Sequence, residues 1–142
     1  MICNPKNGRC DFIVDGYQAR ASFLTDVPME IADAFIALYD RQKAKAVVSF
    51  SGQLSPYDLI LSRSMGDSYV MDFLLTQVHI IDKHIDDLLE EFLDDIERDG
   101  IDRWTEFMVY KESEKAYREK KDLFERKINQ LQDVRQRINS HS

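Results

Sequence analysis

The pattern of apolar residues changes near residue 81, and this change limits the folds open to the chain. Before it, short β-branched and aromatic runs are separated by turn residues, which is typical of strands. After it, apolar residues recur every three or four positions, which is typical of amphipathic helices. Strands followed by helices predict an α+β protein with a mostly antiparallel sheet, because alternating strands and helices would be needed for a parallel one.

The first part of the chain predicts about five strands and one helix. Asp15-Gly16 lies between two β-rich runs, and this dipeptide favours a hairpin turn with positive φ at both central positions. A helix is expected over 27–42, where Asp26 can act as its cap and Pro28 suits its first turn. The apolar run of 67–81 is compatible with a helix as well, but its residue types favour one or two strands. The expected strands cover 9–14, 17–24, 45–52, 57–62 and part of 67–81, with a linker at 53–56.

The second part of the chain predicts helices. One helix is expected over 83–99, because its apolar residues fall within one arc and Gly100 is placed to end it. Residues 101–140 contain neither glycine nor proline, and they can form one helix or two. Within them, apolar residues at heptad spacing predict a short coiled-coil seam, formed by Tyr117, Phe124, Leu131 and Ile138, with Ile128 and Val134 between them.

Together these elements predict an α+β fold. A mostly antiparallel sheet of about five strands, in the order β-β-α-β-β-β, is packed by two helices and followed by a long C-terminal helix. The length of 142 residues corresponds to one domain with an appendage. The expected division is an α+β domain over 1–110 and a C-terminal helical extension over 111–142.

The charge distribution narrows the classes of partner. The net charge of -7 argues against nucleic acid and anionic membranes, because both require a basic surface. No apolar run is long enough to span a membrane, and the first ten residues do not resemble a signal peptide. A cytoplasmic protein is therefore expected, with Cys3 and Cys10 as free thiols and no cofactor.

The expected helix over 83–99 is unusually acidic. Residues 82–106 carry 11 acidic and 3 basic side chains, a net charge of -8, whereas residues 107–142 carry 6 acidic and 9 basic ones, a net charge of +3. A solvated polar face explains most of these acids, but like charges four residues apart destabilise a helix. A basic surface could compensate them, either from the chain's own C-terminal region or from a partner. The acids expected to meet that surface are Asp86, Glu90, Asp94 and Glu97.

A metal site is an alternative use of the same helix. His84, Asp87 and Glu91 are spaced at i, i+3 and i+7, and therefore share one side of the expected helix. A histidine with two carboxylates can bind a divalent ion such as iron or manganese. However, metal sites normally take ligands from several elements, and acids are so frequent here that this spacing is also expected by chance.

The sequence favours a non-catalytic protein–protein interaction domain. Self-association into a homodimer is expected through the C-terminal seam, with the residues Tyr117, Phe124, Leu131, Val134 and Ile138. The first alternative is an acidic, immunity-type neutraliser that occupies the basic cleft of a toxin or nuclease. The second is a metal-dependent enzyme that uses His84, Asp87 and Glu91.

Overall fold

The computed structural model describes residues 1–50 and 56–140, which form an α+β fold with two antiparallel sheets. The expectation of one sheet with about five strands was wrong, because the strands divide into a sheet of three and a sheet of four. The first sheet has the order β1-β2-β3, with β1 at Ile2–Lys6, β2 at Arg9–Val14 and β3 at Tyr17–Ser22. The second has the order β4-β5-β6-β7, with β4 at Lys45–Phe50, β5 at Tyr57–Ser62, β6 at Tyr69–Asp72 and β7 at Gln77–Ile80.

The first strand is the element that the sequence did not reveal. β1 pairs with β2 through a turn at Asn7 and Gly8, whose φ angles are 53° and 74°. Positive φ at both central positions is the geometry of a type I′ hairpin turn, the same type expected at Asp15-Gly16. The other strands agree with the expected ranges, and 67–81 forms two strands rather than a helix. The expected strand end at Gly52 and the linker residues 53–55 lie outside the described residues.

The two sheets pack against each other through an aromatic cluster. The ring of Phe12 in β2 lies 4.9 Å from that of Phe50 and 5.5 Å from that of Tyr57, measured between centroids. Phe50 and Tyr57 stack on each other across β4 and β5 at 4.5 Å. The Tyr57 hydroxyl donates a hydrogen bond to the carbonyl oxygen of Arg20 in β3, at 3.0 Å. These inward-facing rings fix the four-stranded sheet on the three-stranded one, so its other face points away from the core.

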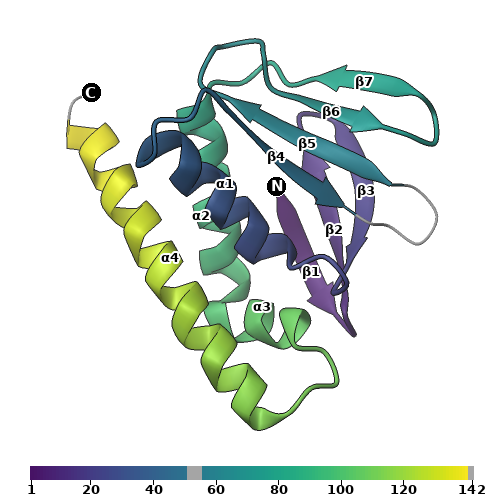
Figure 1. Ribbon diagram of the computed structural model, residues 1–142, viewed down its shortest axis with the longest axis vertical. Coiled ribbons are helices and arrows are strands. Elements are labelled where there is room, and N and C mark those ends of the chain that lie inside the picture. The colour runs from purple at the N-terminus through teal and green to yellow at the C-terminus, as the bar shows by residue number, and fades with distance from the viewer. Residues whose placement is uncertain (51–55, 141–142) are drawn as a thin grey trace.

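The four helices of the described chain lie on the other side of the molecule (Figure 1). The helix expected over 83–99 is confirmed as α2. The helix expected over 27–42 is present as α1, but it ends at Tyr39, three residues earlier than expected. Residues 101–140 form two helices rather than one, because the chain turns at 109–113. The helices are α1 at Val27–Tyr39, α2 at Ile85–Asp99, α3 at Ile101–Met108 and α4 at Glu114–Ser140.

The long helix α4 runs along α1, α2 and α3, on the side of the molecule opposite the four-stranded sheet (Figure 1). Its buried side chains belong to the same hydrophobic cluster as those of both sheets. Within the described part of the chain, no helix is both long and apolar enough to cross a membrane.

Candidate interaction surface

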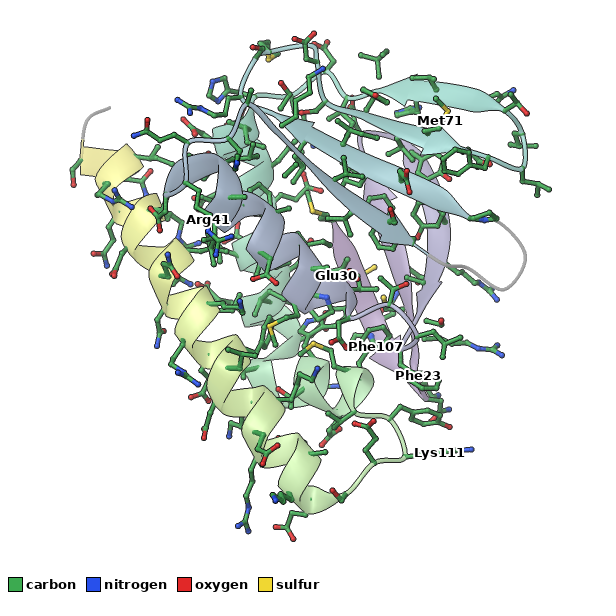
Figure 2. The ribbon with its side chains drawn as sticks, in the orientation of Figure 1. Phe23, Glu30, Arg41, Met71, Phe107 and Lys111 are labelled. Atoms are coloured by element: carbon green, nitrogen blue, oxygen red, sulfur yellow. The ribbon has the colours of Figure 1, made fainter. Side chains whose placement is uncertain are left out.

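The outer face of the four-stranded sheet is mostly apolar and is exposed at its two edge strands, whereas Ile60 near its centre is 7% exposed. Strand register places Val47, Ile60, Tyr69 and Ile80 side by side in one row across all four strands. The next row contains Ser49, Asp58, Met71 and Val78. The two outermost strands expose the most, since Val47 is 57% exposed and Ile80 is 55% exposed. Figure 2 shows Met71 within this sheet, at the end of the molecule opposite Lys111.

The turn between β6 and β7 extends this surface. Its residues Phe73, Leu74 and Leu75 are all more than half exposed. The carboxylate of Asp72 organises the turn, because its Oδ1 accepts hydrogen bonds from the backbone amides of Leu74 at 3.0 Å and Leu75 at 3.1 Å. Its Oδ2 accepts a third hydrogen bond, from the Tyr17 hydroxyl at 2.9 Å. The amide of Leu75, followed by the Tyr17 hydroxyl and the amide of Leu74, lowers the pKa of Asp72, and a stable carboxylate therefore fixes an apolar turn.

We call these side chains the apolar sheet face, comprising Val47, Ile60, Tyr69, Met71, Phe73, Leu74, Leu75, Val78 and Ile80. Their combined exposed area is on the order of 600 Å², at or above the upper end of what a typical monomer exposes in one patch. A standard protein–protein interface buries about 800 Å² on each partner, so this face with its polar rim is large enough for one.

The rim of the apolar sheet face carries one charge of each sign. Lys45 in β4 and Asp58 in β5 point to the outer side, as the alternation along each strand requires. Within the described residues neither side chain has an ion-pair partner. The face is therefore close to neutral, although the whole chain has a net charge of -7.

Sequence reasoning missed this surface, although a signal was present. An antiparallel sheet with one solvated face normally alternates apolar and polar residues. β6 instead has apolar residues on both sides, as does part of β4, where Val47 and Val48 are adjacent. Such strands indicate that apolar side chains on both faces of the sheet need to be buried by packing.

The predicted C-terminal seam is buried within the chain. Phe124 and Leu131 are fully buried and Val134 is 2% exposed, all in the cluster shared with α1, α2 and α3, while Tyr117 and Ile138 are partly exposed. The heptad pattern thus corresponds to the contact of α4 with its own chain. Dimerisation through this seam stays a prediction.

The predicted acids of α2 are compensated from α4, mainly by Arg135. Its guanidinium lies 2.6 Å from Glu97, 3.2 Å from Asp94 and 3.5 Å from Glu90. Hydrogen bonds from Gln132 and Arg135 lower the pKa of Glu97. The fourth predicted acid behaves differently, because Asp86 accepts a hydrogen bond from the Tyr39 hydroxyl of α1.

Other cations of α4 bind outside the acidic face of α2. Lys120 pairs with Asp26 before α1 at 2.7 Å, and Lys121 pairs with Asp102 of α3 at 2.8 Å. Lys127 pairs with Asp33 of α1. Together with Arg135, these cations bind acids on or next to each of the three helices that α4 contacts. The C-terminal cations therefore orient α4 on its own chain, in the manner that partly exposed ion pairs set orientation more than stability.

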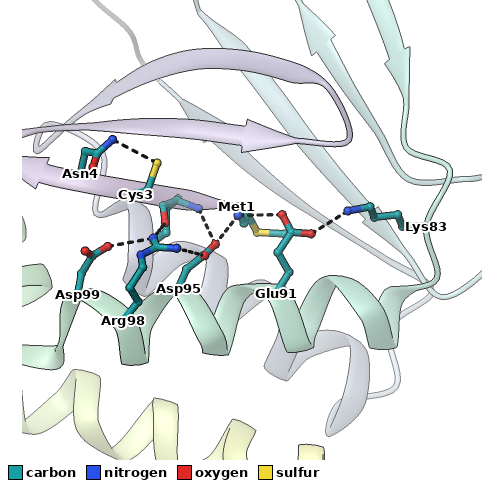
Figure 3. Close-up of polar contacts among 9 residues, drawn as sticks. Met1, Cys3, Asn4, Lys83, Glu91, Asp95, Arg98 and Asp99 are labelled. Carbon is teal, nitrogen blue, oxygen red and sulfur yellow. Dashed lines mark hydrogen bonds and ion pairs between the residues drawn. The ribbon is translucent and has the colours of Figure 1, made fainter.

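A second set of α2 carboxylates binds the first residue of the chain (Figure 3). The ammonium group of Met1 pairs with Glu91 at 2.9 Å and with Asp95. Glu91 also binds Lys83 at 3.1 Å, and Asp95 binds Arg98 at 2.9 Å. These contacts use the carboxylates on the side of α2 that faces β1.

The three predicted metal ligands have separate roles. The Nδ1 atom of His84 accepts a hydrogen bond from the backbone amide of Asp86, so His84 is the N-cap of α2. Glu91 is taken up by the ammonium of Met1 and by Lys83, and Asp87 is exposed. In the part of the chain that the structure describes, no three His, Cys, Asp or Glu side chains are grouped closely enough to bind a metal ion.

The apolar sheet face is the main concentration of exposed apolar side chains. Six of the ten large apolar residues that are most exposed in the described chain belong to it. The other four are Ile13, Leu24, Met65 and Leu123, which lie on other segments.

No protein-family model, curated protein or solved structure matches this chain.

Proposed function

We propose that this chain is a non-catalytic protein–protein interaction domain that associates with a second copy through the apolar sheet face. The observation that carries the proposal is the concentration of exposed apolar side chains on the two edge strands of one sheet and on the adjoining turn. Water contact with such a surface is unfavourable, and a packed partner removes it.

A second copy is the partner that the surface suits best. Two twisted sheets can pack face to face at a separation of about 10 Å, as in β-sandwiches. The absence of strong charge on the face means that two copies with a net charge of -7 each are not locally repelled there. In a twofold arrangement, Lys45 and Asp58 on the rim supply groups of opposite sign to each other's copy.

The proposal keeps the self-association expected from the sequence but gives it another location. The seam residues Phe124, Leu131 and Val134 are in contact with the chain's own helices, whereas Val47, Val78 and Ile80 are exposed. Because the acids of α2 bind Arg135 and other groups of the same chain, fewer of them are free for a basic toxin. A cytoplasmic location belongs to the proposal, supported by the free thiols of Cys3 and Cys10.

Light scattering after size exclusion tests the proposal over a range of protein concentrations. We expect a dimer with a dissociation constant on the order of micromolar, since the buried area is near the lower end of specific interfaces. The dimer should persist at high salt, because its contacts are apolar rather than ionic.

Two variants and a control locate the interface. Ile80→Asp and Val47→Asp place a charge at the two edges of the face, and each should give a monomer at concentrations where the unaltered chain is a dimer. Leu123→Asp makes the same kind of change on α4, at a side chain that is 41% exposed, and should leave the dimer intact. A monomeric unaltered chain at about 100 µM, where a micromolar dimer would be well populated, would refute the proposal, as would a dimer that both sheet variants retain.

A further inference from the structure

The outer face of the three-stranded sheet carries a cationic pocket, in an otherwise acidic protein. The pocket has a volume of about 450 Å³ and lies on the β1–β2 hairpin, β3 and Tyr110, the second residue after α3. We call it the cationic pocket. The residues that line it include Lys6, Arg9, Arg20, Asp11, Asn4 and Tyr110.

Strand register explains why the charges converge. Lys6 and Arg9 are directly opposite each other next to the hairpin turn, so their side chains share one face of the sheet. Asp11 is two residues beyond Arg9 on β2 and therefore shares that face, and Arg20 of β3 is opposite Asp11. Three cations and one carboxylate are thus held on one surface by the backbone itself.

This arrangement is unfavourable for the folded protein alone. Like charges directly opposite each other destabilise an antiparallel pair, and Lys6 and Arg9 are such a pair. Within the described part of the chain, none of the three cations has an ion-pair partner, although most cations of α2 and α4 have one. Asp11, the one acid present, accepts a hydrogen bond from the Asn4 amide at 3.0 Å. The pocket therefore keeps a net charge of +2, for which the described residues supply no ion pair.

The β1–β2 turn and Tyr110 form a fixed wall of the pocket. Gly8 has a φ of 74°, and a Cβ atom placed on it would lie 2.7 Å from the Tyr110 ring, so the ring packs directly on the backbone. The same ring also lies 5.3 Å from that of Phe23, measured between centroids, and the Lys111 ammonium lies 5.2 Å from its centroid. Figure 2 shows Phe23 and Lys111 at this end of the molecule, apart from Arg41 beside α1.

The pocket is built for binding rather than for covalent chemistry. Its one thiol, that of Cys10, is 2% exposed, and burial raises its pKa to about 12. A thiol that stays protonated at neutral pH is a poor nucleophile. Besides the Asp11 carboxylate and Tyr110, the groups that remain are guanidinium, ammonium and amide donors.

We propose that the cationic pocket binds the phosphate group of a small ligand. Guanidinium groups present paired N–H donors that match phosphate oxygens, and Lys6 adds a point charge. A phosphate group carries nearly two negative charges at neutral pH, which balances the net charge of the pocket. The pocket is separate from the apolar sheet face, so this inference does not depend on self-association.

Titration calorimetry of the full chain tests the inference, with inorganic phosphate, pyrophosphate and acetate as probes in an amine buffer of constant ionic strength. We expect saturable binding of phosphate and tighter binding of pyrophosphate, because the second phosphate adds charge. Arg9→Gln and Arg20→Gln should each weaken pyrophosphate binding roughly tenfold or more, since each removes charge-assisted hydrogen bonds. Both side chains are exposed, so the fold should be retained.

Arg41→Gln is the matched control, because it removes the same charge from another exposed arginine. It should change the affinity less than about twofold, since charges beyond a Debye length are screened. The inference is overturned if neither phosphate compound shows saturable binding by about 10 mM. It is equally overturned if acetate binds as well as phosphate, or if Arg41→Gln weakens binding as much as the pocket variants do.

Discussion

The placement of α4 on its own chain can be tested with Leu131→Ala. Leu131 is fully buried in the core that α4 shares with the other helices and the sheets. The substitution removes three carbon atoms, which corresponds to about 2.4 kcal/mol of lost transfer free energy at about 0.8 kcal/mol each. The cavity left behind adds to this, so the free energy of unfolding should fall by about 3–5 kcal/mol.

Leu123→Ala supplies the control, because the same substitution is made eight residues earlier on the same helix at a side chain that is 41% exposed. Its effect should stay below about 1 kcal/mol, since little buried surface is lost. Both variants should also carry Ile80→Asp, so that association through the sheet does not contribute. The assay is urea unfolding, followed by circular dichroism, at two protein concentrations that differ a hundredfold.

The concentration dependence separates an intramolecular seam from an intermolecular one. If α4 packs on its own chain, the unfolding midpoint and the cost of Leu131→Ala are the same at both concentrations. If the seam instead joins two chains, the apparent stability of the parent rises by about 2.7 kcal/mol over that range, and Leu131→Ala reduces the rise. That second result would refute the intramolecular packing.

Three further substitutions test particular contacts by urea unfolding. Arg135→Gln leaves three carboxylates of α2 without their cation and should cost about 1 kcal/mol at low salt and less at high salt, where repulsion is screened. Gly8→Ala should cost about 1–3 kcal/mol, because the positive φ at this position is unfavourable for a residue with a Cβ atom and the added methyl meets the Tyr110 ring; an unchanged midpoint would contradict this. The folded-state pKa of Asp72 is lowered, so its contribution to stability is present at neutral pH and is lost as the pH falls through that pKa. Asp72→Asn should therefore lower the free energy of unfolding at pH 7. It should also make the further decrease of stability below about pH 4 smaller than in the unaltered chain.

The local elements were largely predictable because short-range rules determine them. The turn at Asp15-Gly16, the helix α2 and its end at Gly100 follow from turn chemistry and apolar spacing within a few residues. β1 was missed since Ile2–Lys6 contains asparagine and proline, which are rare in strands, and its pairing depends on a bulge next to Asn4, whose φ is 55°.

The candidate surface could not be assigned from sequence alone for a different reason. Apolar residues on both faces of β6, and Val78 and Ile80 on the outer face of β7, indicate burial, but they do not indicate by what. The heptad pattern of α4 likewise requires a partner surface, and it fits a second chain as well as the chain's own helices. Both patterns indicate that apolar side chains must be buried against another surface. Which surface this is depends on the arrangement of elements that are distant in the sequence.

The sequence by itself therefore determined the α+β class and the helical second half, and it indicated that the acidic helix lacks compensating charge of its own. Only the tertiary structure decided that the strands separate into two sheets, that α4 covers α1, α2 and α3, and that the outer face of β4–β7 is left exposed. The reason is that apolar patterns specify how much surface must be buried, whereas the packing of aromatic residues such as Phe12 and Tyr57 between the sheets selects which faces meet.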